Sequence, residues 1–261
     1  MSTAEPHRPV AAIAWMLLTG VFFILVTALV KYMGRRLPAA EAAFLRYAMG
    51  LIFILPVLGS LRAAHLNKRQ WSLFGLRGFL HALGVILWFY SMTRIPIAEV
   101  TAMNYLAPIY VTIGAAVFLG EKLATRRIVA VLMGLLGAAI ILRPGFREVS
   151  TGHLALLAAA VVFAGSYLLA KIMADEVRPA VVVAMLSIFV TLGLAPFAVP
   201  VWIMPTGQEL LILMAVACFA TAGHYTMTLA FAAAPLTVTQ PVTFLQLVWA
   251  MLLGWFAFGE A

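Results

Sequence analysis

The sequence predicts an all-α integral membrane protein, and three observations lead to this prediction. Of the 261 residues, 65% are hydrophobic and 10% are charged, whereas soluble domains are about 45–50% apolar and about one quarter charged. The apolar residues form runs long enough to cross a bilayer as helices, which takes about 20 residues. The runs lack the period-two alternation of barrel strands. Similar segments also recur along the chain, which indicates two related halves.

Nine apolar runs follow one another along the chain. Turn-forming and charged residues fill the short gaps between them, for example at positions 34–38, 66–69 and 143–145. Backbone polar groups in lipid must pair within their own segment, so we expect each run to be a spanning helix. The runs cover about residues 10–30, 39–59, 72–92, 97–119, 125–142, 153–171, 180–200, 209–233 and 236–258.

The Lys and Arg residues of the gaps predict the orientation, because cytoplasmic loops are enriched in them. With a cytoplasmic N-terminus, the inner loops hold eight of these residues and the outer loops hold five. The first run has no cleavage pattern after it, so we expect it to remain in the protein. The basic residues are scattered between apolar blocks, which argues against nucleic acid as a partner and leaves the lipid bilayer as the surrounding medium.

Internal similarity predicts that the chain contains two repeats. Residues 95–121 align without a gap on residues 234–260, at an offset of 139 positions, and the same offset pairs Gly84 with Gly223. Near the start of each half, an offset of 140 aligns Lys31 and its neighbours with a second Lys-containing block. The first four helices are therefore expected to recur as helices six to nine.

The repeat boundaries predict a ten-helix architecture. The first repeat (1–147) continues into a fifth helix, whereas the second repeat (148–261) ends before an equivalent tenth helix. Either the sequence is truncated or the protein has lost this last helix, and we favour truncation. Five helices per repeat place equivalent segments in inverted orientations, and transporters with such repeats bind their substrates near the middle of the membrane.

The chain resembles the EamA-type members of the drug/metabolite transporter superfamily. The resemblance lies in the blocks Phe118-Leu119-Gly120-Glu121-Lys122-Leu123 and Trp255-Phe256-Ala257-Phe258-Gly259-Glu260, and in the Ala43-Phe44-Leu45-Arg46-Tyr47 segment. It implies a bundle of two inverted five-helix repeats in a bacterial inner membrane. It also implies transport of a small metabolite such as an amino acid, a purine or nucleoside-like compound, or a drug. The segment from Val30 to Arg46, with Leu76-Arg77-Gly78, is similar to the branch that includes S-adenosylmethionine carriers.

Two histidines in apolar runs are candidate substrate-binding residues. Under the offset of 139, His224 corresponds to Val85, one helical turn beyond His81. The two histidines therefore lie on equivalent faces of equivalent helices and could line one central cavity. An imidazole can bind a carboxylate or transfer a proton. The alternative is a hydrogen bond that only holds two helices together.

Further polar and aromatic residues could line the same cavity. Trp88 lies seven residues after His81 on the same helix face, where it could stack on a ligand or belong to an interfacial aromatic belt. The two helices that contain Pro108 and Pro241 present polar stripes, because spacings of three and four share a face. The candidate substrate-binding residues on them are Thr101, Asn104, Tyr105, Thr243 and Gln246.

Lys31, Arg46 and Glu99 form a candidate gating or coupling set. Glu41 and Arg46 are five residues apart, so they point about 140° away from each other on one helix. Arg46 therefore needs a partner elsewhere, and Glu99 could provide it. A structural ion pair is the alternative to a role in gating.

The remaining sequence features exclude several classes of function. Cys218 is the single cysteine, and no G-x-x-x-x-G-K-[ST] or H-E-x-x-H motif is present, so we expect no metal, no cofactor and no catalytic residues. A membrane-embedded enzyme would need a cluster of carboxylates. A non-transporting scaffold or sensor is the alternative to a transporter of a small-molecule substrate. Association of two copies into a homodimer is a further alternative that the sequence leaves open.

Overall fold

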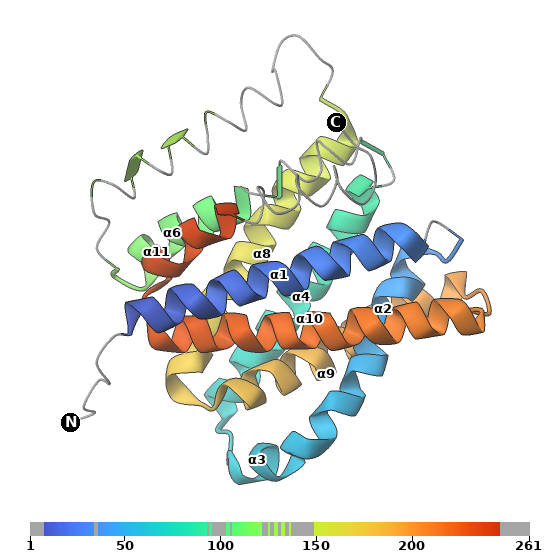
Figure 1. The fold of residues 1–261 in the computed structure, drawn as a ribbon, viewed down its shortest axis with the longest axis horizontal. Coiled ribbons are helices and arrows are strands. Elements are labelled where there is room, and N and C mark those ends of the chain that lie inside the picture. Colours follow the sequence, from blue (N-terminus) through green and yellow to red (C-terminus); the bar gives the residue numbers. More distant parts are fainter. Residues whose placement is uncertain are drawn as a thin grey trace.

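The chain folds into long helices that pack side by side (Figure 1). The computed structural model describes residues 8–33, 36–92, 94–95, 103–104, 106–121, 125, 128–129, 132–133, 136 and 149–245. Within these ranges every regular element is a helix, as the predicted all-α class requires. The long helices are α1 (Pro9–Met33), α4 (Lys68–Met92), α8 (Thr151–Glu176), α9 (Pro179–Ala198) and α10 (Gly207–Ala233).

The remaining elements are shorter helices and 3-10 segments. The helical stretch of residues 39–63 adopts 3-10 geometry around Pro56. Proline lacks a backbone N–H, and its ring crowds the carbonyl four residues earlier, here that of Ile52. The shorter elements are α2 (Ala39–Gly50), η1 (Leu51–Val57), α3 (Leu58–Ala63), α6 (Leu106–Phe118), η2 (Val199–Val201), α11 (Leu236–Thr239) and η3 (Gln240–Phe244).

Six of the described helical segments are long and apolar enough to cross a membrane, and α6 is a shorter apolar helix. Large apolar side chains such as Phe79, Val117, Leu192 and Leu211 are more than 60% exposed on the outside of the bundle. Lipid, rather than water, is the solvent that favours such a surface. The predicted runs at 125–142 and 236–258 lie mostly outside the described residues.

Side-chain caps set the starts of α10 and α4. Thr206 Oγ1 accepts a hydrogen bond from Glu209 N at 3.2 Å, and Glu209 Oε2 accepts one from Thr206 N at 2.7 Å. Asn67 and Gln70 exchange the same two bonds at the start of α4, at 2.9 and 3.1 Å. Each pair satisfies backbone donors that the first helical turn leaves open.

Hydrogen bonds and an ion pair between helix ends place the connections at two opposite ends of the bundle. Lys171, near the end of α8, donates to Phe231 O, near the end of α10, at 2.7 Å. Arg8 N, before α1, donates to Ala233 O at 2.9 Å, so the start of α1 lies at the same end. Arg36, after α1, pairs with Glu209 at the start of α10. The two ends are separated by the length of α10, about 40 Å at 1.5 Å per residue.

The long helices form two closely packed pairs. Helix α1 packs along α10, and helix α4 packs along α8 (Figure 1), while α9 packs against α2 and α4. Small residues line the contacts of α8 and α10, which allows the backbones to approach closely, as is usual between membrane helices. The fully or nearly fully buried alanines of these helices are Ala159, Ala160, Ala164, Ala170, Ala217, Ala220 and Ala230.

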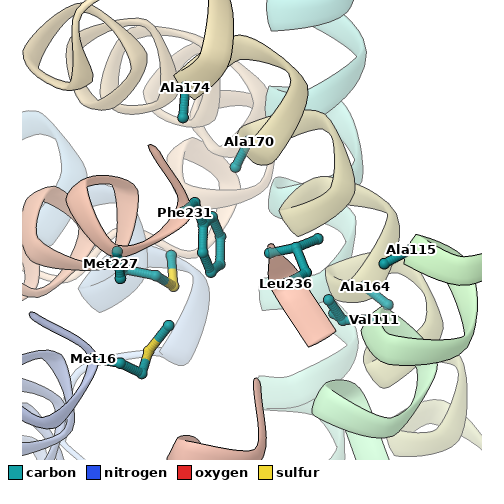
Figure 2. Close-up of a cluster of buried hydrophobic side chains, with 10 residues drawn as sticks. Met16, Val111, Ala115, Ala164, Ala170, Ala174, Met227, Phe231 and Leu236 are labelled. Carbon is teal, nitrogen blue, oxygen red and sulfur yellow. The ribbon is translucent and has the colours of Figure 1, made fainter. Parts of the chain in front are cut away.

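An apolar cluster joins both pairs near one end of the bundle (Figure 2). It combines residues from α1, α6, α8, α10 and α11, and Phe231 is its largest fully buried side chain. Met16 of α1 and Met227 of α10 lie beside each other in this cluster. The N-terminus of α11 is fixed next to it, because the Glu121 carboxylate accepts hydrogen bonds from Leu236 N and Thr237 N, both at 2.9 Å.

Candidate functional site

The two predicted histidines meet in the middle of the bundle. His81 of α4 and His224 of α10 are 3% and 5% exposed, and their rings lie 5.4 Å apart at 74°. Each ring also contacts one phenylalanine edge-on. Phe163 of α8 lies 5.1 Å from His81, and Phe23 of α1 lies 5.2 Å from His224. The histidines therefore lie where the α4–α8 pair meets the α1–α10 pair.

Two glycines make room for the phenylalanine rings. A Cβ atom on Gly84 would lie 2.7 Å from Phe163 Cε1, and one on Gly223 would lie 3.3 Å from Phe23 Cε1. Gly84 and Gly223 are the glycines paired by the offset of 139, and the two phenylalanines are 140 positions apart. The same local arrangement of glycine, phenylalanine and histidine thus occurs twice in this region.

Polar groups surround the histidine pair. His81 Nδ1 and Ser166 Oγ of α8 share a hydrogen bond of 3.3 Å, whereas His224 Nδ1 has no partner among the described residues. The rings of Tyr47 and Tyr167 lie 6.1 and 6.4 Å from the ring of His81. The site therefore combines aromatic walls with imidazole and hydroxyl groups that can donate or accept hydrogen bonds.

Two arginines lie beside this aromatic group without a carboxylate partner among the described residues. Arg77 lies one turn before His81 on α4 and is only 1% exposed. Its Nη1 donates to Val182 O at 2.8 Å, whereas Nε and Nη2 have no partner among the described residues. The guanidinium carbon of Arg46 lies 4.0 Å from the centre of the Tyr47 ring. Both arginines are near enough to interact electrostatically with His81.

An apolar cavity of about 270 Å³ lies between α2, α4 and α9. Its lining includes Ala43, one turn before Tyr47, and Val85, one turn after His81. The cavity therefore lies about one helical turn from the histidine and tyrosine rings. Its volume is close to the lower limit of ligand pockets, about 300 Å³.

The other predicted substrate-binding residues are distributed more widely. Trp88 packs against an apolar cluster that includes Met103 and Leu106. Asn104 is exposed, and Thr243 is partly buried with its hydroxyl donating to Gln240 O at 2.6 Å. Three candidates, Thr101, Tyr105 and Gln246, lie outside the described residues.

Of the predicted gating or coupling set, only the Arg46 side chain is described. Glu99 lies outside the described residues, and so does the side chain of Lys31, whose backbone belongs to α1. Glu41, which was expected to point away from Arg46, is buried and accepts a hydrogen bond from Ile203 N at 2.8 Å. The pairing of Arg46 with Glu99 stays a prediction.

Sequence reasoning did not single out several residues of this site as functional. Arg77 had a usable signal, because it is charged, lies within an apolar run and is four residues before His81. Ser166 and Tyr167 are likewise polar residues within the apolar run of α8. Phe23 and Phe163 had no such signal, since aromatic residues are common on lipid-facing and buried surfaces alike.

The arrangement is suited to binding a ligand. No group of three or more potential metal ligands occurs in the described part of the chain. What it offers is two cations, two imidazoles and several aromatic rings, largely buried between helices from both halves of the sequence. Such a set can recognise a planar ring by stacking and a polar or charged substituent by hydrogen bonds.

Comparisons with known proteins place the chain among transporters. The EamA-like transporter family matches residues 10–143 and 150–261. The chain is 31% identical to a riboflavin transporter from Vibrio cholerae over 97% of its own length and 87% of the relative's. It is 28% identical to an S-adenosylmethionine uptake transporter from Rickettsia prowazekii, over 95% and 84% of the two chains. One crystal structure shares the fold with a TM-score of 0.78 at 20% identity, over 96% of this chain and 89% of that one.

Proposed function

This chain belongs to the EamA-like transporter family, and we propose that it moves a small metabolite with a planar ring across a bacterial inner membrane by alternating access. Family membership confirms the prediction of a multi-pass membrane transporter and not an enzyme. The single observation that supports the site is the contact between His81 and His224 at 5.4 Å. It joins α4 of the first half to α10 of the second.

The proposed binding site is the group of side chains around these histidines. Phe23, Phe163 and Tyr47 provide ring faces and edges, and Ser166 provides a hydroxyl group. Flat aromatic ligands gain about 0.5–1.5 kcal/mol for each such ring pair beyond the area that they bury. Two relatives are named as transporters of riboflavin and of S-adenosylmethionine, and both compounds contain a planar heterocycle.

The two inverted repeats remain part of the proposal, and the packing supports them. If the first helix of each repeat packs on the third helix of the other, then α1 should pair with α10 and α8 with α4. Both pairs are present, and each places a phenylalanine against a glycine and a histidine. A binding site between two such pairs can open to either side when one pair tilts against the other.

Transport by the full chain in proteoliposomes tests this function. The panel consists of labelled riboflavin, S-adenosylmethionine, aromatic amino acids and purine nucleosides. We expect saturable flux of at least one compound, and we expect His224→Ala to lower its rate at least tenfold because the variant removes one wall of the site. Tyr225→Ala is the matched control, since Tyr225 is 40% exposed and lies next to His224.

Two outcomes would count against the proposal. Without saturable flux of any compound, a carrier function fails and the scaffold or sensor alternative is favoured. If flux occurs but His224→Ala behaves like Tyr225→Ala, the transporter stands and the site lies elsewhere. Purification yield and unfolding temperature of each variant establish that a loss of flux does not arise from misfolding.

A further inference from the structure

We propose that the transported metabolite carries a negatively charged group, a carboxylate or a phosphate, and that the guanidinium of Arg77 binds it. This inference rests on the proposed function, because it names the substrate class for the same site. The observation behind it is a buried arginine that keeps one complete edge of its guanidinium unpaired.

Arg77 uses only one of its three nitrogens for a hydrogen bond within the described structure. Nη1 donates to Val182 O at 2.8 Å, and the side chain is fully enclosed between α4 and α9. Nε and Nη2 have no partner among the described residues. Buried donors normally have partners, and a buried donor without one is destabilising, more so when the group is charged.

The unpaired edge of Arg77 is the one that suits a carboxylate. Arg36 shows this elsewhere in the same molecule, because its Nε donates to Glu209 Oε1 at 2.7 Å while its Nη2 donates to Glu209 Oε2. Parallel bonds from two guanidinium nitrogens to two oxygens give both strength and orientation. Arg77 therefore presents the same pair of atoms that Arg36 uses to hold a carboxylate.

The protein does not provide the missing anion within its described residues. Each described carboxylate accepts a hydrogen bond from a group other than Arg77. Glu41 accepts from Ile203 N, Glu121 from Leu236 N and Thr237 N, Asp175 from Lys171, Glu176 from Arg69 and Glu209 from Arg36. A cation inside a membrane protein is costly unless a counter-charge is near. An anionic substrate supplies that counter-charge.

The neighbours of Arg77 indicate where the rest of the ligand lies. Arg77 interacts electrostatically with Tyr47, Tyr167 and His81, which belong to the aromatic group already described. Arg46, against the Tyr47 ring, adds a second positive charge beside these rings. A ligand whose acid lies on Arg77 can therefore place its planar ring among the tyrosine and histidine rings.

Matched pairs of compounds test the charge requirement. The full chain in lipid nanodiscs is titrated with flavin mononucleotide against riboflavin, which differ by a phosphate, and with tryptophan against tryptophan amide, which differ by a carboxylate charge. We expect the anionic member of at least one pair to bind at least tenfold more tightly. The pair that shows the preference distinguishes a phosphate from a carboxylate.

Variants of Arg77 assign the preference to this side chain. Arg77→Gln should abolish the difference between the members of a pair, and Arg77→Lys should keep part of it because the charge remains while the two-pronged edge is lost. Arg62→Gln is the control, since Arg62 is exposed on α3. If Arg77→Gln does not fold, the comparison of Arg77→Lys with wild type decides, because a purely structural arginine would leave the preference unchanged.

Several results would overturn the inference. These are equal binding of the charged and neutral members, equal weakening of both members in the Arg77 variants, or no binding of any of the four compounds. The proposed function is judged separately by flux. Saturable transport of a neutral compound alone would support the proposed function and contradict the requirement for an acidic group.

Discussion

Lys171 is a buried cation whose role follows from two hydrogen bonds. Its Nζ donates to Phe231 O at 2.7 Å and to Asp175 Oδ1 at 2.8 Å. Phe231 lies in the last turn of α10, where carbonyls have no partner within the helix. A positive charge there also opposes the partial negative charge of the helix end. Lys171 thus fixes the end of α10 against α8.

Replacing Lys171 by methionine tests this role. Lys171→Met keeps the apolar stem but removes both bonds and leaves Phe231 O buried and unpaired. We expect the free energy of unfolding to fall by about 1–3 kcal/mol, the cost of an unsatisfied buried polar group. Thermal unfolding in detergent measures the effect, with the exposed Lys68→Met as control. Equal melting temperatures of the two variants would contradict it.

Part of the candidate site could be predicted at this scale, and the rest could not. The spacing of His81 and His224 relative to the repeat offset predicted equivalent helix faces, and the two rings do meet. Helical periodicity specifies which residues share a face, but it does not specify which helix lies opposite. Tyr47 of α2 and Ser166 of α8 reach His81 from helices whose placement depends on the packing of the whole bundle.

Helices α4 and α9 are in close contact where Gly78 faces Phe189. A Cβ atom on Gly78 would overlap Phe189 Cβ and lie 3.3 Å from its backbone carbonyl carbon. These atoms cannot move without shifting α9 itself. At Gly84, in contrast, the opposing atoms belong to the Phe163 ring, and a ring can rotate. The contact at Gly78 therefore fixes the distance between two helices.

Adding one methyl group at this contact gives a sharp test. Gly78→Ala should lower the yield of folded protein and the melting temperature strongly, because overpacking of this kind costs about 1–3 kcal/mol or more. Gly59→Ala is the matched control, since a Cβ atom there meets nothing within 4 Å. Alanine favours a helix over glycine by about 1 kcal/mol, so Gly59→Ala should be neutral or slightly stabilising. A Gly78→Ala protein as stable as wild type would show that α9 can shift freely.

Hydropathy predicted where the helices are, but not how they begin or bend. The run predicted at 72–92 begins in the structure at Lys68, because Asn67 and Gln70 cap the helix with polar side chains. The run predicted at 39–59 continues to Ala63 and changes to 3-10 geometry around Pro56. Hydropathy reflects contact with lipid. Caps and prolines change the backbone geometry but have little effect on hydropathy.

Two polar links join the halves of the sequence at opposite ends of the bundle. Arg36 pairs with Glu209 at one end, while Arg69 and Gln70 both donate to Glu176 at the other, at 2.7 and 3.1 Å. Positions 36 and 176 differ by 140, and positions 70 and 209 differ by 139. The links therefore occupy equivalent places with the charges exchanged, as inverted repeats would place them.

The link at the Arg36 end remains charged under all ordinary conditions. The hydrogen bonds that Arg36 donates to the Glu209 carboxylate raise the pKa of the Arg36 guanidinium further above its already high ordinary value. Helices α1 and α10 also pack against each other from the Arg36–Glu209 link at one end to the contact between Arg8 and Ala233 at the other. Under the proposed alternating access, we expect the two helices joined by this link to move together and the contact between the two pairs, at the histidines, to change.

The orientation of the whole molecule is the last prediction. Among the described connections, Lys68, Arg69 and Arg178 lie at the end of the bundle that holds Arg8, whereas Arg36 and Arg94 lie at the other end. The excess of positive charge predicts that the Arg8 end faces the cytoplasm. Cys218 is the only cysteine, so a Cys218→Ala background allows single cysteines to be placed at either end.

Labelling intact cells with a membrane-impermeant maleimide then reads the orientation. Met204→Cys, at a position 79% exposed beyond η2, should react from outside, and Lys68→Cys should react only after the membrane is permeabilised. The reverse pattern would show the opposite orientation in the membrane, with the two positions still on opposite sides. Reaction of both positions from the same side would contradict the alternation of the connections. The inverted repeats would then fail with it, because equivalent helices can face opposite ways only if Lys68 and Met204 lie on opposite sides.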